Sequence, residues 1–287
     1  MKVITRKKGT KKYFYLKHSF RKDGKVMSKE IYLGTEIPEN IDKMKEELEI
    51  EQKNEIFGRL EEIKKNFQRE WKRVPESARQ REKEEIAIAF TYNTNAIEGS
   101  TITLEEAREI IHDKISPRKP MKDVRETETH AKVFLTVLDD KNSIDIPTIL
   151  KWHIDIFGST KEDIAGKFRK YLVSVGAYVA PDWQDVEELM KEFSLFLRKN
   201  GTNPVEFAAR AHYRFEKIHP FGDGNGRIGR LILNHILWHN GYPMIIIEYK
   251  KRRAYYRALE KDEEGFVKYF LRRYFTAHKR RLGKRRL

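Results

Sequence analysis

Apolar residues recur every three or four positions through most of the chain, which is the spacing of amphipathic helices. Helices are predicted over residues 76–97, 124–138, 146–157, 186–197, 204–218, 228–238 and 255–275. A longer helix precedes them, because apolar positions keep helical spacing from Ile41 to Trp71 before Pro75 interrupts the pattern. Thr103 and Glu106 form a capping box that starts another helix. The pattern therefore indicates a mainly α protein.

Two segments have a β pattern instead. The runs 13–20 and 26–33 are rich in β-branched and aromatic residues, and Asp23-Gly24 lies between them, which is a strong hairpin signal. This predicts a small N-terminal β-hairpin module. A second short hairpin is expected within residues 168–181, where β-prone residues surround a glycine.

The composition excludes several classes of protein. Hydrophobic residues make up 39% of the chain and mean hydropathy is −0.74. No stretch approaches the roughly 20 apolar residues of a membrane span, and no secretory signal pattern opens the chain, so a cytoplasmic protein with no membrane contact is expected. Because cysteine is absent, disulfides, iron–sulfur clusters and thiol catalysis are excluded.

The positive charge lies at the two ends of the chain. Residues 1–35 hold 11 Lys or Arg and 2 acidic residues, and residues 250–287 hold 15 Lys or Arg and 4 acidic residues. The whole chain has a formal net charge of +15, so the 214 residues between these ends are mildly acidic. These basic ends could bind nucleic acid or an acidic partner, although runs of basic residues are often only solvated.

Residues 218–230, IHPFGDGNGRIGR, carry the clearest chemistry and lie between two predicted helices. Three glycines in five residues leave backbone N–H groups accessible just before a helix, and such loops bind phosphate. Asp223 supplies an oxygen ligand suited to Mg²⁺, Arg227 and Arg230 could clamp phosphate oxygens, and His219 titrates near neutrality. These are the components of phosphoryl or nucleotidyl transfer. A simple flexible connector would not account for the four side chains.

Residues 219–230 match the signature of the Fic family, His-Pro-Phe-x-(Asp/Glu)-Gly-Asn-Gly-Arg-x-x-Arg, without departure. Residues 165–169 and 253–259 also resemble segments of that family, so the similarity covers roughly residues 76–275. Most members transfer AMP from ATP to a protein hydroxyl. The resemblance implies a Fic-type helical core with a short β-hairpin flap at residues 173–180, which would align a target segment by strand pairing.

The resemblance also implies roles for single residues. His219 would be the general base toward a Ser, Thr or Tyr hydroxyl of a target protein, and Asp223 would hold Mg²⁺ against the phosphates of the substrate ATP. The ATP-binding residues would be Gly224, Asn225, Gly226, Arg227 and Arg230. Phe221 is expected to pack beneath the loop rather than react.

Residues 94–99, TNAIEG, resemble an inhibitory motif that some Fic proteins carry before the core. In that class Glu98 would pair with Arg230 and displace the γ-phosphate of ATP, so Thr94, Glu98 and Gly99 are the predicted regulatory residues. Glu98 could instead be a solvated residue near the end of a helix.

The predicted organisation has four parts: a β-hairpin module at 1–38, a connecting helix at 39–75, a catalytic core with its inhibitory helix at 76–277, and a basic tail at 278–287. Protein adenylyltransfer with autoinhibition by Glu98 is the leading hypothesis. Removal of AMP by the same site is one alternative, and a nucleic-acid or partner-binding protein with a nucleotide-sensing loop is another. Self-modification and a homo-oligomer are left open.

Overall fold

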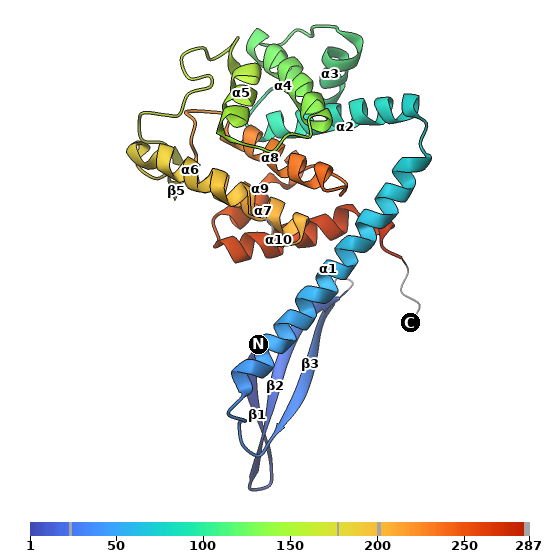
Figure 1. Cartoon of the computed structure of the whole chain (residues 1–287), viewed down its shortest axis with the longest axis vertical. Helices are drawn as coiled ribbons and strands as arrows, with labels where there is room; N and C mark the ends of the chain where they lie inside the picture. Colours follow the sequence, from blue (N-terminus) through green and yellow to red (C-terminus); the bar gives the residue numbers. More distant parts are fainter. Residues whose placement is uncertain (23–24, 177, 200–201, 284–287) are drawn as a thin grey trace. The chain divides into compact units, whose positions relative to one another are not determined.

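A computed structural model describes residues 1–22, 25–176, 178–199 and 202–283 (Figure 1). Contacts divide the chain into two units, Met1–Arg59 and Leu60–Leu287, which are described separately. The boundary falls inside one long helix, α1 (Ile41–Arg73). The four-part organisation predicted from the sequence stays a prediction.

The first unit contains an antiparallel sheet of three strands, β1 (Lys2–Lys8), β2 (Lys11–Lys22) and β3 (Lys25–Gly34), in the order β1-β2-β3. The sequence predicted only the β2–β3 hairpin, and its Asp23-Gly24 turn lies outside the described residues. The prediction missed β1 because only two apolar residues, Val3 and Ile4, precede its basic end. In the sheet these two residues pair with Leu16 and Tyr15 of β2.

The second unit is helical. Its α-helices are α2 (Glu76–Ile97), α3 (Leu104–Arg108), α4 (Met121–Asp139), α5 (Ile146–Phe157), α6 (Val186–Leu197), α7 (Pro204–Ile218), α8 (Asn225–His239), α9 (Arg252–Leu259) and α10 (Glu263–Ala277). The mainly α fold class is thereby confirmed. Residues 225–237 of α8 are all buried, and Figure 1 shows this helix in the middle of the unit. Because such a helix is surrounded by protein, its N-terminus is held by its neighbours.

Helix starts follow local signals in the sequence. Thr103 and Glu106 form the predicted capping box at the start of α3, with both reciprocal hydrogen bonds present. The predicted helix 255–275 was wrong as one element, because a turn divides it into α9 and α10. At this turn the Asp262 side chain accepts the Gly265 N–H and starts α10. Among the described residues, none of the helices has the length and apolar character required to span a bilayer.

The short hairpin predicted after α5 is present as β4 (Ser174–Val175) and β5 (Tyr178–Val179), and residue 177 lies outside the described residues. Its base is closed by the Ala180 N–H, which donates to the Val173 carbonyl at 3.1 Å. The Tyr178 hydroxyl donates to the carbonyl of Lys217 at 2.7 Å, and this bond ties the hairpin to the last turn of α7.

The sequence left the basic C-terminal segment either binding a partner or solvated, and Arg281 does neither. Arg281 is buried, donates to Glu70 at 2.8 Å, and lies over the Phe67 ring. Its carbonyl accepts a hydrogen bond from the Asn66 side chain at 2.7 Å. An arginine can bury its stem and pair its head with a carboxylate, so a run of charges need not be solvated.

Candidate active site

His219 ends α7 and begins the loop. It is one of two described non-glycine residues with positive φ, at +52°, and its N–H still donates to the Phe215 carbonyl. Its Nδ1 lies 3.3 Å from the Glu216 carbonyl, which can only accept, so Nδ1 carries the proton and Nε2 the lone pair. Burial lowers the pKa of His219, which keeps the ring neutral near pH 7. A neutral ring with an available Nε2 can accept a proton.

Arg169 holds the beginning of this loop in place. It is buried and donates to the carbonyls of His219 at 2.8 Å, Tyr171 at 2.9 Å and Pro181 at 2.7 Å. Its backbone N–H donates to the carbonyl of Pro220. One guanidinium therefore joins His219 to the segment that carries the β4–β5 hairpin.

The middle of the loop is closed by its own side chains. Asn225 accepts from the Phe221 N–H and donates to the Phe221 carbonyl, both at 2.8 Å. The Phe221 ring is fully buried and stacks on His153 with a centroid distance of 3.9 Å. Gly224 has φ +82°, and a Cβ there would lie 2.4 Å from the Phe157 ring. Only glycine fits this position, directly before α8.

Asp223 lies half-exposed among cations. One carboxylate oxygen lies 2.8 Å from Lys161 Nζ, and the other lies 3.6 Å from the Arg227 guanidinium. Burial alone would raise the pKa of Asp223, but these cations outweigh it and keep the carboxyl ionised. The backbone is fixed as well, because His153 Nε2 donates to the Asp223 carbonyl at 3.0 Å, while its Nδ1 accepts the Gly166 N–H at 2.9 Å.

Glu126 and Lys161 belong to this site and were missed by sequence reasoning. Glu126 on α4 is buried and pairs with the buried Arg227, and it also accepts from Lys161 at 2.9 Å and Thr160 at 3.0 Å. A signal did exist for Glu126, because it falls on the same helical face as His130 and so puts a charge at a core position. Nothing in the sequence singled out Lys161, a loop residue.

Arg230 is the most enclosed cation of the site, with 2% of its surface exposed. It donates to Glu98 at 2.5 Å and to the Thr94 hydroxyl at 2.5 Å. Thr94 lies in the last turn of α2 and Glu98 directly follows that helix, so residues four apart present both groups on one side. Burial opposes the charge of Arg230, but the neighbouring Glu98 outweighs it and raises its pKa.

Glu98 also lies over the beginning of α8. A Cβ placed on Gly226 would approach the Glu98 carboxylate to 2.2 Å, so glycine at this position leaves the carboxylate room. Gly99, with φ +91°, follows the end of α2 beside it. A helix N-terminus attracts negative charge. Glu98 therefore places a negative charge both on Arg230 and at the start of α8.

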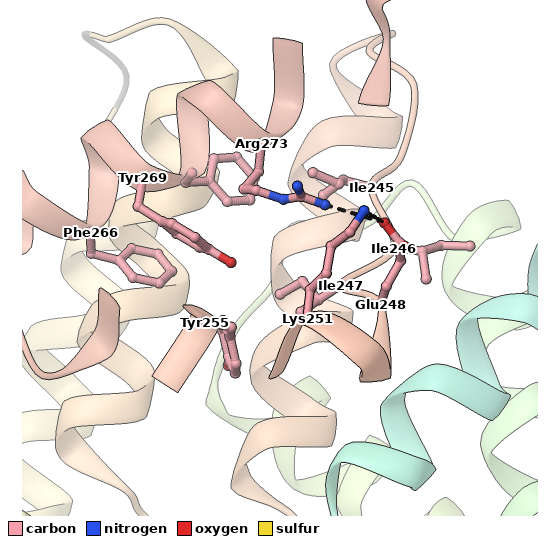
Figure 2. Close-up of a pocket in the computed structure, with 10 residues that line it drawn as sticks. Ile245, Ile246, Ile247, Glu248, Lys251, Tyr255, Phe266, Tyr269 and Arg273 are labelled. Carbon is pink, nitrogen blue, oxygen red and sulfur yellow. Dashed lines mark hydrogen bonds and ion pairs between the residues drawn. The ribbon is translucent and has the colours of Figure 1, made fainter. Parts of the chain in front are cut away.

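A small cavity lies elsewhere in the unit, between the segment before α9 and helix α10 (Figure 2). At its rim Glu248 pairs with Arg273 at 3.2 Å and also with Lys251. The cavity measures about 10 Å³, room for roughly one water molecule. None of the predicted site residues lines it, and it is too small for a nucleotide.

Comparison with known proteins agrees with this geometry. Residues 143–237 match the model of the Fic/DOC family. The chain is 35% identical over 196 residues to a protein named protein adenylyltransferase Fic from Nematostella vectensis, covering 66% of this chain and 46% of the relative. A relative of the same name from Drosophila ananassae is 35% identical over 203 residues, which are 68% of this chain and 41% of the relative. The chain thus spans less than half the length of these curated relatives.

Solved structures give a similar result. Fic-1 of C. elegans, residues 134–508, superposes with a TM-score of 0.68 at 27% identity, covering 82% of this chain and 73% of the other. A Fic family protein from Desulfovibrio desulfuricans superposes with a TM-score of 0.67 at 26% identity, covering 78% of this chain and 73% of the other.

Proposed function

We propose that this chain, which belongs to the Fic family, transfers AMP from ATP to a hydroxyl group of a protein. The observation that carries the proposal is the segment from the end of α7 to the start of α8, residues 219–226, where a neutral histidine, an ionised aspartate and a glycine-lined helix N-terminus follow one another. The printed names of the relatives point to the same reaction.

His219 acts as the general base. Its Nε2 accepts the proton of the target hydroxyl while the hydroxyl oxygen attacks the α-phosphorus of ATP. A bond forms between that oxygen and the α-phosphorus, and the bond to the β-phosphate oxygen breaks, so pyrophosphate leaves. Arg169 holds the His219 backbone and thereby limits the positions of the ring.

The negative charge of ATP is met by the N-terminus of α8. The Gly224 N–H donates to the Asp223 carboxylate at 2.5 Å in this structure, and ATP would replace that bond. The backbone N–H groups of Gly224, Asn225 and Gly226 would then bind the phosphates, while the guanidinium groups of Arg227 and Arg230 neutralise the charge that develops on pyrophosphate. The Glu126 carboxylate pairs with the Arg227 guanidinium, so this cation is oriented before ATP binds.

Asp223 fits the requirements of a magnesium ligand. Its carboxylate is ionised and half-exposed, beside the predicted phosphate site. The described residues contain no cluster of three acidic or histidine side chains that would hold a metal alone. Mg²⁺ is commonly bound by one or two carboxylates together with substrate phosphates, so Asp223 would hold the ion that neutralises phosphate charge. Lys161 must release Asp223 for this to happen.

Glu98 inhibits the reaction in this proposal. It occupies Arg230 and the space above Gly226, both of which the γ-phosphate of ATP would need. ATP would then bind weakly or with its α-phosphorus displaced from the hydroxyl. Thr94 holds Arg230 in the inhibited arrangement, and the turn at Gly99 sets the end of the inhibitory helix.

The β4–β5 hairpin is the proposed docking strand for the target. Val175 and Val179 are exposed on it, and Tyr178 ties it to the last turn of α7, next to His219. A target segment that pairs with this edge would bring a Ser, Thr or Tyr hydroxyl toward His219. A neighbouring copy of the chain could also present that hydroxyl, which would give self-modification.

The test is incubation of the parent and of Glu98→Gly, in which the proposed inhibition is removed, with Mg²⁺, α-labelled ATP and a cell lysate, each with and without the change His219→Ala. Label on protein that depends on His219, shown by its loss in His219→Ala, is the expected result. Label that persists in His219→Ala would contradict the proposed base. Loss of label from protein already carrying AMP would instead identify AMP removal as the reaction of this site.

A further inference from the structure

The N-terminal sheet presents one solvent-facing side that the proposed reaction does not use. Leu16 of β2 is fully buried on the opposite side, where His18 bonds to Gln52 of α1 within the same unit. Side chains alternate along a strand, so Tyr13, Tyr15 and Lys17 point to the other side. The paired strands add Lys2, Arg6, Glu30 and Tyr32 to that side.

Three tyrosine rings form the centre of this side, which we call the tyrosine face (Tyr13, Tyr15 and Tyr32). The Tyr15 and Tyr32 centroids are 5.3 Å apart, and those of Tyr13 and Tyr32 are 6.3 Å apart. Tyr32 is 56% exposed although it is a large ring. Neighbouring rings on a β-sheet provide flat surfaces at a spacing that unstacked bases can use.

Positive charge surrounds these rings. The Arg6 guanidinium lies 5.1 Å from the centre of the Tyr15 ring, and Lys2 and Lys17 are cross-strand partners on the same side. Among the side chains described on this side, Glu30 is the acid, and Arg6 and Lys17 both pair with it. Residues 1–35 together hold 11 basic and 2 acidic residues. The tyrosine face therefore attracts a polyanion.

From this combination we infer that the tyrosine face binds single-stranded nucleic acid. The basic residues contact the phosphates, and Tyr15 and Tyr32 stack with successive bases. Positive charge alone would bind any polyanion. The exposed Tyr32 ring and the half-buried rings beside it add affinity for a polyanion whose bases are accessible. A duplex hides its bases inside the stack, so it should bind more weakly than a single strand.

The test is fluorescence anisotropy of the full chain with labelled oligouridylate and with a duplex of equal length, without ATP. Tyr32→Ala should weaken single-strand binding by roughly tenfold, while Tyr32→Phe, which keeps the ring, should bind like the parent. Leu195→Ala removes an exposed apolar side chain from α6 and serves as the matched control with parental affinity. Arg6→Gln should reduce the dependence of log affinity on log salt by about 0.7 if one phosphate contact is lost.

Three results would overturn the inference: equal affinity of Tyr32→Ala and the parent, equal affinity for duplex and single strand, or no oligonucleotide binding, whether or not the chain binds anionic lipid vesicles. Tyr32 is exposed, so its variants should keep the parental melting temperature, and loss of binding would not reflect unfolding. Because ATP is absent, the outcome is independent of the proposed transfer reaction.

Discussion

The buried pair of Glu126 and Arg227 should support the stability of the catalytic unit. Both residues are at most 6% exposed. Glu126→Gln would leave the Arg227 charge buried, and Asp223, at 3.6 Å, is the other acid that pairs with it among the described residues. Removing one partner of a buried pair costs about 3–5 kcal/mol. Since Asp223 supplies some compensation, we expect a loss of about 3 kcal/mol, which corresponds to a melting temperature lower by roughly 6–12 °C for a unit of this size.

Tryptophan fluorescence during thermal or urea unfolding can measure this loss. All four tryptophans lie at or after position 71, so the signal reports the second unit rather than the N-terminal sheet. Glu128→Gln is the matched control, because Glu128 is on the same helix, is more exposed, and forms an ordinary surface pair with Lys132. That variant should change stability by less than about 0.5 kcal/mol.

A loss below about 1 kcal/mol for Glu126→Gln would refute this reasoning. Such a value would mean that water or Asp223 fully compensates the Arg227 charge. It would also remove the argument that Arg227 is oriented before ATP binds.

Three further predictions concern the base and the C-terminal segment. Burial lowers the pKa of His219, and the base must be neutral to accept a proton, so kcat/KM should rise with pH through a midpoint below 6.5 and level off above it. A midpoint at or above 6.5 would contradict this assignment. His219→Ala should abolish transfer while calorimetry shows nearly parental ATP affinity, because the base contacts the acceptor hydroxyl and not the nucleotide; lost ATP binding would argue against the role. Arg281→Gln should destabilise the second unit by about 1–2 kcal/mol, as it removes a charged hydrogen bond to Glu70, whereas an unchanged melting curve would show that this contact contributes nothing.

Helices and the loop could be predicted because their signals are local. The apolar spacing of 146–157 and 204–218 gave helix bounds that match α5 and α7, since each helix has one buried face and a proline in its first turn. The loop was recognisable because its side chains are consecutive. Part of its folded geometry follows from residues within it, such as the bonds between Asn225 and Phe221. The contacts from Arg169 and His153 come from outside the loop and could not be predicted from its sequence.

Contacts between distant segments could not be predicted in the same way. Lys161 is joined to Asp223 and Glu126 only after α4 and the loop are packed together, and nothing near Lys161 in the chain indicates this. The packing of Arg281 on α1 is a contact of the same kind. The strand β1 was missed because it is defined by its pairing with β2 rather than by its own composition.

The initial rate of AMP transfer by Glu98→Gly, compared with the parent over a range of ATP concentrations, tests the central claim most directly. Freeing Arg230 should allow the γ-phosphate to bind and align the α-phosphorus, and a misalignment near 1 Å can cost about a hundredfold in rate, so we expect a rise of that order. Arg230→Ala should show no such rise, because it removes the phosphate contact together with the partner of Glu98. Equal rates for Glu98→Gly and the parent at every ATP concentration would contradict the account.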